Sequence, residues 1–154
     1  MTIAATLVAP AACSPSATRA TGFSLPAVVE AKPDVAVSFP ADKPIVVNFF
    51  AAWCEPCRRE LPLLAATATA HPRVRFVGVD HQDSRSNATD LLDETHVPYE
   101  SAYDPQGTLA SRFVVRGFPT TLFVAADGTI LERVRGELKA AQLDALLLRL
   151  EGTR

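Results

Sequence analysis

Residues 45–57 read IVVNFFAAWCEPC, an apolar run that leads directly into two cysteines, Cys54 and Cys57. A short run rich in β-branched and aromatic residues predicts a buried strand, and the residues that follow Cys54 predict a helix. Two thiols separated by two residues at such a junction are typical of a dithiol/disulfide pair. The sequence therefore predicts a redox pair where a strand passes into a helix.

The two cysteines are expected to differ in role. A cysteine at the start of a helix faces unpaired backbone N–H groups and the positive end of the helix dipole, and both stabilise a thiolate. Cys54 is therefore the predicted nucleophile. Cys57 shares a helix face with Leu61 and Leu64, where burial suits a resolving cysteine. Pro56 falls in the first turn, where a missing N–H costs little, and we expect it to keep the sulfurs close.

A pair of cysteines with this spacing is also half of a four-ligand zinc site. Such a site needs two further thiols or imidazoles at defined spacing, and the chain offers only Cys13 and the scattered His71, His81 and His96. We therefore expect no metal. The histidines are expected to be structural or solvated, with His71 and His96 at helix ends and His81 in a loop after a strand.

Two prolines extend the pattern around the cysteines. Pro62 stands inside the helical run 58–70, where we expect it to kink the helix. Pro119 stands shortly before the apolar strand 122–124, and a proline in that position is a candidate for a cis peptide bond.

With W-C-x-P-C, Pro62 and Pro119 in this order, residues 22–150 resemble the thioredoxin superfamily. Residues 46–62 (VVNFFAAWCEPCRRELP) and 117–130 (GFPTTLFVAADGTI) look most like the extracytoplasmic TlpA/ResA-type thiol-disulfide oxidoreductases. Some members of that group serve cytochrome c maturation.

The pattern along the chain predicts one α/β domain. Strands are expected at 35–39, 45–51, 74–80, 121–125 and 130–135, and helices at 54–70, 86–96, 107–114 and 139–150. The resemblance implies a thioredoxin fold, in which helices cover both faces of a central mixed sheet. Residues 84–103 resemble the helix and strand that TlpA/ResA-type proteins insert near the active-site end, where the insert would help to select partners.

Residues 1–21 differ in composition from the thioredoxin-like domain that we expect over 22–154. The first 12 residues are small and apolar, too few to span a bilayer, and Ala9-Pro10-Ala11 resembles a signal-peptide cleavage site. Residues 11–13 resemble a lipobox, in which Cys13 would carry a lipid. We expect an export signal, a lipoprotein-type segment or a disordered tail, and a protein that is cell-envelope associated or secreted.

Asn48 stands six residues before Cys54, where many thioredoxins have a buried aspartate that takes the proton of the resolving thiol. An amide cannot titrate. Glu60, three residues after Cys57, matches the glutamate that follows the motif in ResA-like proteins, so the resemblance implies a catalytic role for it. The alternative is an exposed acid in the second turn of the helix.

Charges beside the cysteines bear on the redox potential. Glu55 lies between them and disfavours a thiolate, whereas Arg58 and Arg59 oppose this effect or are simply solvated. We expect a potential nearer to that of thioredoxin, about −270 mV, than to that of DsbA, about −120 mV.

The resemblance places Trp53 and Phe118 on either side of the reactive sulfur. Their rings, together with the backbone before Pro119, would form a shallow apolar groove in which an extended client strand could pair. Trp53, Pro56, Phe118 and Pro119 are therefore the expected substrate-binding residues.

These observations predict a protein-disulfide oxidoreductase that mainly reduces its clients. The Cys54–Cys57 pair carries the electrons, so no bound cofactor is needed, and the resemblance implies a membrane electron donor of the CcdA/DsbD kind. The net charge is −2 and the chain has no run of basic residues, so nothing in the sequence indicates nucleic-acid binding. This charge is compatible with a protein client. We expect a monomer.

Three alternatives stay open from the sequence. The first is an oxidative, disulfide-forming catalyst on the same fold. The second is a copper-handling module, although such modules tend to space their thiols by three residues and to carry a histidine on a late loop. The third is a peroxidase, although such enzymes carry Thr or Ser three residues before the reactive cysteine, where this chain has Ala51.

Overall fold

A computed structural model describes residues 18–153, and Cys13 and most of the predicted export segment lie outside this range. The elements are β1 (Phe23–Leu25), β2 (Val35–Val37), β3 (Ile45–Phe50), α1 (Glu55–Ala70), β4 (Arg75–His81), α2 (Arg85–Glu94), β5 (Ser101–Asp104), α3 (Thr108–Arg112), β6 (Thr120–Val124), β7 (Ile130–Arg135) and α4 (Ala140–Glu151).

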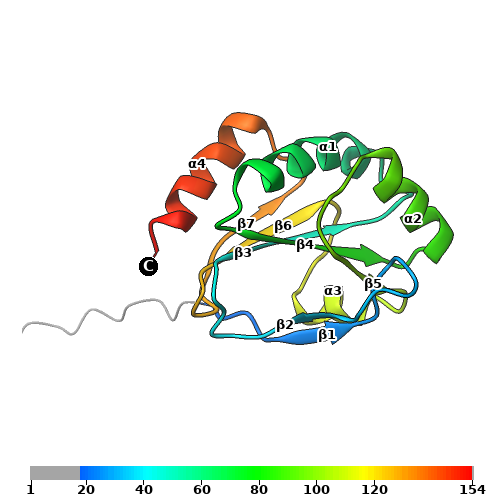
Figure 1. Ribbon diagram of the computed structural model, residues 1–154, viewed down its shortest axis with the longest axis horizontal. Helices are drawn as coiled ribbons and strands as arrows, with labels where there is room; N and C mark the ends of the chain where they lie inside the picture. Colours follow the sequence, from blue (N-terminus) through cyan, green and yellow to red (C-terminus); the bar gives the residue numbers. More distant parts are fainter. Residues whose placement is uncertain (1–17, 154) are drawn as a thin grey trace, which may run out of the picture.

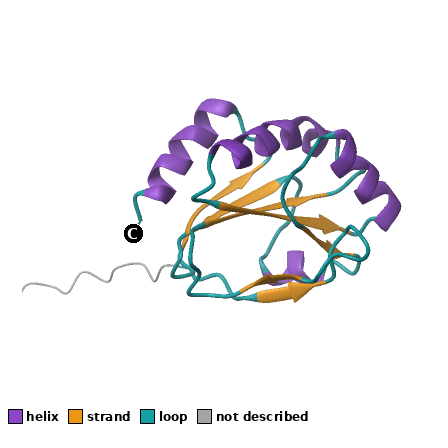
Figure 2. Cartoon of the chain, viewed as in Figure 1, coloured by secondary structure: helices purple, strands orange, loops and turns teal. Residues whose placement is uncertain are grey.

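The main sheet has five strands in the order β5-β4-β3-β6-β7. Strands β3, β4 and β5 are parallel, whereas β6 and β7 are antiparallel to their neighbours. Strands β1 and β2 form a separate antiparallel ribbon. Helices α1, α2 and α4 cover one face of the sheet, and α3 and the ribbon lie on the other (Figures 1 and 2). The predicted mixed sheet with helices on both faces is confirmed.

Strand β3 is central and all six of its residues are buried. Ile45, Val47 and Phe49 pack in the cluster that includes residues of α3 and the ribbon. Val46 and Phe50 pack on the opposite face, against the helices. A strand covered on both faces needs a nearly continuous apolar run, which is why the sequence of β3 lacks a polar alternation.

Several element boundaries differ from those predicted. Strand β2 ends at Val37, ahead of the cis Phe39–Pro40 bond. Helix α3 has only five residues and stops at Arg112, and Val114 beyond it has φ 54°, a left-handed conformation that cannot continue a helix. Helix α1, in contrast, continues through Pro62.

The packed part of the chain begins ahead of residue 22. Arg19 forms a β-bridge with Thr129, and Ala20 is buried and donates its N–H to the carbonyl of Gly128 over 2.7 Å. These contacts attach the start of the described chain to the turn between β6 and β7.

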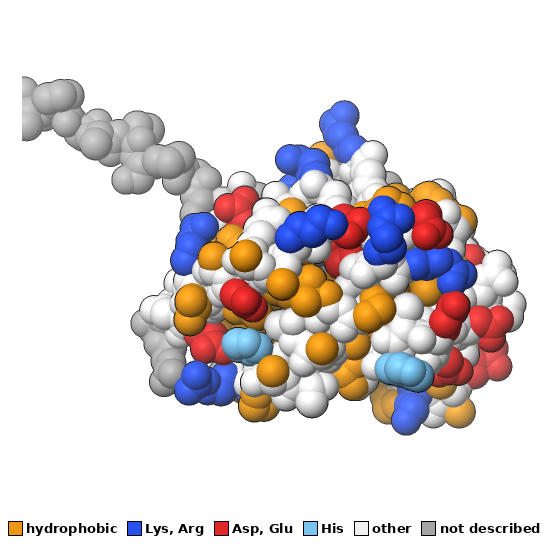
Figure 3. All heavy atoms as spheres, turned by 90° about the horizontal axis from the view of Figure 1, so that it is seen from above, with side chains coloured by type: hydrophobic (Ala, Val, Ile, Leu, Met, Phe, Trp, Pro, Cys, Tyr) orange, Lys and Arg blue, Asp and Glu red, His pale blue; other side chains and the backbone are white. Residues whose placement is uncertain are grey.

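Within residues 18–153, none of the helices combines the length and the hydropathy that a bilayer crossing requires. On the helix-covered face, seen from above in Figure 3, acidic and basic side chains are interspersed.

Candidate active site

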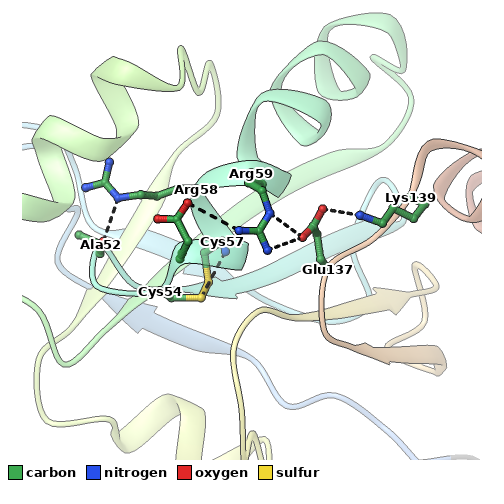
Figure 4. A network of polar contacts seen from close by, with 8 residues as sticks. Ala52, Cys54, Cys57, Arg58, Arg59, Glu137 and Lys139 are labelled. Carbon is green, nitrogen blue, oxygen red and sulfur yellow. Dashed lines mark hydrogen bonds and ion pairs between the residues drawn. A yellow bond between two sulfur atoms is a disulfide. The ribbon is translucent and has the colours of Figure 1, made fainter.

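The cysteine pair lies where β3 passes into α1, as predicted. Cys54 is the N-cap of α1, and Pro56 stands in the first turn. Cys54 and Cys57 form a disulfide, and both residues are buried, with exposed fractions of 5% and 1%. The backbone N–H of Cys57 is shared between the carbonyl of Cys54, over 3.0 Å, and Sγ of Cys54, over 3.2 Å (Figure 4). When the disulfide opens, this N–H is in place to stabilise a thiolate on Cys54.

Glu60 is buried, with an exposed fraction of 1%, so the alternative of a solvated acid is wrong. Its Oε1 accepts a hydrogen bond from Nδ2 of Asn48 over 2.8 Å, and its Oε2 accepts one from the backbone N–H of Leu138 over 2.6 Å. Burial raises the pKa of Glu60 to about 7, although both hydrogen bonds act in the opposite direction. The carboxyl group therefore changes protonation near neutral pH.

Asn48 occupies the buried position that the sequence suggested. Its Nδ2 also donates to Oγ1 of Thr121 on β6 over 2.9 Å, while its Oδ1 has no hydrogen-bond partner in the described chain. Thr121 and Leu138 were not predicted as neighbours of Glu60, because nothing in the local sequence indicates which distant residues pack against α1.

Arg58 is tied to the loop before the cysteines. Its Nε donates to the carbonyl of Ala52 over 3.2 Å, and its Nη1 lies 2.6 Å from Oε2 of Glu94 at the end of α2. The carboxylate of Glu94 thus compensates the guanidinium charge of Arg58, which reduces the stabilisation that Arg58 could give to a thiolate in the cysteine pair.

Arg59 is part of a chain of charges on the other side of the motif. Its Nη2 lies 2.9 Å from Oε2 of Glu137, whose Oε1 is 2.5 Å from Nζ of Lys139 (Figure 4). Nη1 of Arg59 also lies 3.6 Å from Oε1 of Glu55. These contacts hold the β7–α4 loop beside α1, and Leu138, the donor to Glu60, belongs to that loop.

The segment that resembles an insertion lies beside the cysteines, as the resemblance implies. Ala88, Leu91 and Leu92 of α2 belong to the same buried cluster as Cys54 and Cys57. Asp83, just before α2, accepts the backbone N–H of Ala52 on its Oδ2 over 2.5 Å. The contact from Asp83 was not predicted from the sequence.

Trp53 is an exposed aromatic residue beside the pair, with an exposed fraction of 60%. Its ring meets Phe118 edge to face, with centroids 5.7 Å apart and planes at 81°. The Phe118–Pro119 bond is cis, as predicted. Trp53, Phe118 and Pro119 are therefore brought together, from the β3–α1 junction and from the loop before β6.

His81 was expected to be structural or solvated, in a loop after a strand, and the structure shows a packed residue that still belongs to the strand. It is the last residue of β4, it is partly buried, and its ring stacks on Phe118 with centroids 4.5 Å apart. Its place at the carboxyl end of a central parallel strand, where binding sites gather in open α/β sheets, is the signal that could have identified it.

Asp80 is a second buried acid that the sequence did not reveal. It is fully buried in β4, and neither of its carboxyl oxygens has a hydrogen-bond partner in the described chain. Burial, together with the nearby Asp83 and Asp104, raises the pKa of Asp80 to about 8. Its carboxyl group is therefore largely neutral at pH 7.

Within residues 18–153, His, Cys, Asp and Glu side chains form no group of three that could hold a metal ion. The only sulfur chemistry that the described site offers is that of the Cys54–Cys57 pair.

Comparison with known proteins gives a consistent result. A model of the AhpC/TSA family matches residues 17–133. The thiol:disulfide interchange protein CycY of Rhizobium leguminosarum bv. viciae is 41% identical over 87 residues, which cover 56% of this chain and 46% of CycY. The thiol-disulfide oxidoreductase ResA of Oceanobacillus iheyensis is 27% identical over 107 residues, which cover 68% of this chain and 56% of ResA.

Among solved structures, that of MTB dsbF, in mixed oxidized and reduced forms, superposes with a TM-score of 0.76 at 28% identity. The match covers 83% of this chain and 94% of that one. The fold is therefore the thioredoxin fold, and the resemblance to ResA-type proteins is confirmed. The chain spans about half the length of the curated relatives that it matches.

Proposed function

The chain belongs to the AhpC/TSA family, and from this membership and the geometry of its cysteine pair we propose that it is a protein-disulfide oxidoreductase. The observation that carries the proposal is the disulfide at the start of α1, with the N–H of Cys57 directed at Sγ of Cys54. Relatives named as thiol:disulfide interchange protein and thiol-disulfide oxidoreductase support it.

In the proposed reductive cycle, the Cys54 thiolate attacks one sulfur of a client disulfide. A mixed disulfide forms, and the second client sulfur leaves as a thiolate that takes up a proton. The Cys57 thiol then loses its proton and attacks Sγ of Cys54. This step restores the Cys54–Cys57 disulfide and releases the remaining client sulfur as a thiolate, which takes up a proton. Two electrons pass from the cysteine pair to the client, and the two protons that the client takes up are balanced by the proton lost from Cys57 and one from solvent.

Glu60 is the proposed acceptor of the Cys57 proton. Its pKa of about 7 lets it take up and release a proton at neutral pH, which the amide of Asn48 cannot do. Asn48 and the N–H of Leu138 hold the carboxyl group in one orientation.

The client would lie against Trp53, Pro56, Phe118 and Pro119. The exposed ring of Trp53 and its edge contact with Phe118 offer an apolar surface next to the sulfurs. The direction of transfer is proposed to be reductive because Glu55 withholds stabilisation from a thiolate, and Arg58 and Arg59 are each paired with carboxylates.

The setting of the reaction is proposed from the sequence resemblance. The protein would act outside the cytoplasm on a limited set of clients, such as apocytochrome c, and a membrane protein of the CcdA/DsbD kind would return electrons to it. Residues 1–21 would serve as an export signal or lipid attachment segment for the domain at 22–154. We propose a monomer with no further cofactor and no nucleic-acid partner.

The roles of the two cysteines are tested in a Cys13→Ser background, which removes the third thiol. Cys54→Ser should abolish the reduction of insulin disulfides. Cys57→Ser should still attack and should accumulate mixed disulfides with the client, because nothing releases the adduct. Non-reducing gels and mass spectrometry measure the adduct.

Equal trapping of adducts by both variants would refute the assigned roles. Undiminished insulin reduction by the Cys54→Ser variant would refute the proposed function itself.

A further inference from the structure

His81 is packed between two parts of the chain at the edge of the site. Its ring stacks on Phe118 with an angle of 26° between the planes. On the α3 side it lies so close to Gly107 that a Cβ added there would be 2.5 Å from Cε1 of His81. Gly107 has φ 69°, in the left-handed region, and its lack of a side chain makes room for the imidazole. The ring thus has little freedom to move.

Stacking connects His81 to the reactive end of the molecule. Phe118 contacts His81 through its face and Trp53 through an edge-to-face arrangement, so the three rings form a continuous row. We call His81, Phe118 and Trp53 the ring row. Trp53 directly precedes Cys54, and Phe118 packs against the buried cluster that contains both cysteines. One end of the ring row therefore adjoins the disulfide.

Packing on Phe118 and against Gly107 holds His81 in this position. Its Nδ1 is buried and has no hydrogen-bond partner in the described chain. Burial lowers the pKa of His81, although Asp104 and a hydrogen bond with the side chain of Gln82 act in the opposite direction, so a neutral, flat imidazole faces Phe118 at pH 7. A neutral aromatic ring stacked on Phe118 limits the positions that Phe118 can adopt.

We propose that His81 is a positioning residue that holds Phe118 against Trp53, and that the ring row selects client segments with an aromatic or large aliphatic side chain next to the target cysteine. The inference rests on the proposed function, since it concerns the client of the same disulfide. The exposed ring of Trp53 supplies the contact area, and Phe118, kept in place by His81, closes one side of it.

The test uses two peptide disulfides that differ only beside the cysteine, where one has Phe and the other has Gly. Turnover by the wild type, His81→Ala and His81→Leu is measured with dithiothreitol as the electron source. His96→Asn is the matched control, because His96 is exposed and its φ of 53° suits asparagine. The wild type should prefer the Phe peptide. Both His81 variants should raise KM for that peptide about three- to tenfold with little change in kcat, and should leave the Gly peptide unaffected.

A spectroscopic measurement adds an independent readout, because Trp53 is the single tryptophan of the chain. Acrylamide should quench the fluorescence of reduced His81→Leu more strongly than that of the reduced wild type and of His96→Asn. If His81→Ala fails to fold, His81→Leu, which keeps apolar bulk without a ring, decides the question.

Two results would overturn the inference while leaving the oxidoreductase proposal intact: a wild type that reduces both peptides equally well, or a His81→Leu variant that keeps the preference and the quenching of the wild type. Failure of the wild type to reduce either peptide would instead contradict the proposed function.

Discussion

At the scale of single residues, Glu60 gives the site a pH dependence near neutrality. Its pKa is raised from 4.5 to about 7, so it is mostly protonated below pH 7 and mostly ionised above it. The rate of resolution by Cys57 should therefore rise with pH through about 7 in the wild type. Glu60→Gln should remove this rise of the rate with pH. It should also slow resolution by Cys57 more than the initial attack by Cys54. Stopped-flow decay of a preformed mixed disulfide measures resolution.

Glu132→Gln is the control for the loss of a carboxylate, because Glu132 pairs with Arg149 over 3.7 Å and takes no part in the hydrogen bonds of Glu60. A Glu60→Gln variant with the pH profile of the wild type would rule out a proton-transfer role for Glu60.

Asp80 should make stability fall as pH rises. Its folded-state pKa is about 8 and its ordinary value is 3.8, so folding is not penalised below 3.8 and is increasingly penalised as pH rises from 3.8 to 8. Each pH unit in this window costs up to about 1.4 kcal/mol of unfolding free energy. Asp80→Asn, which cannot ionise, should therefore raise Tm at pH 8 but change it little at pH 4.

Differential scanning calorimetry at both pH values measures the effect of Asp80→Asn, and the gain at pH 8 should be roughly 5 °C or more. Asp93→Asn, an exposed change in α2, is the control. An equal shift in Tm at both pH values would show that ionisation of Asp80 is not what limits stability.

At the scale of elements, a hydrogen bond joins the loop between β4 and α2 to the loop between β3 and α1, which leads to the cysteines. Oδ2 of Asp83 accepts the N–H of Ala52, two residues before Cys54, over 2.5 Å. Asp83→Ala should leave this partly buried N–H without its partner, lowering the unfolding free energy by about 1–3 kcal/mol. It should also slow client reduction, because the backbone before the nucleophile loses its support. Denaturant unfolding and insulin turnover measure the two effects.

Asp93→Ala, in the exposed part of α2, should change neither quantity. Should Asp83→Ala lose stability without any change in turnover, the contact would be only structural.

Long elements with a clear pattern could be predicted closely from the sequence, whereas some short ones were missed and others were predicted with bounds that are too long. Strand β3 and helix α1 fall within a residue of their predicted bounds, because an apolar run and a strong helix start define them. Strand β1 has only three residues, too few to display an alternation. The end of α3 depends on the backbone conformation of Val114, which its residue type does not favour.

At the scale of the whole molecule, the balance of charges around the disulfide bears on its potential. Glu55 is exposed, and the two nearby arginines are paired with carboxylates, so the site offers a thiolate little net positive charge. We expect a potential nearer to about −270 mV than to about −120 mV, measured by equilibration against a series of glutathione or dithiothreitol buffers. Glu55→His should raise it.

A potential close to that of DsbA, together with disulfide formation in a reduced test protein, would favour the oxidative alternative. Glu55→Gln separates the loss of the negative charge from the gain of an imidazole.

The candidate site was predictable where it follows the chain locally and unpredictable where it is assembled across the fold. The roles expected for Cys54 and Cys57 depend on a helix start that the sequence contains. The neighbours of Glu60 come from β6 and from the loop after β7, and His81 reaches Phe118 from β4. Such contacts depend on strand order, which no local pattern encodes.

The β-bridge between Arg19 and Thr129 has a practical consequence for handling the protein. Thr129 lies at the β6–β7 turn, beside the end of β6 where Val124 pairs with Ile45 at the start of β3, whereas Cys54 follows the other end of β3. The described part of the chain thus begins at one end of the sheet, and the sulfurs lie at the opposite end. A protein coupled to a sensor chip through its amino-terminal segment would present its disulfide to the flowing analyte instead of burying it against the matrix.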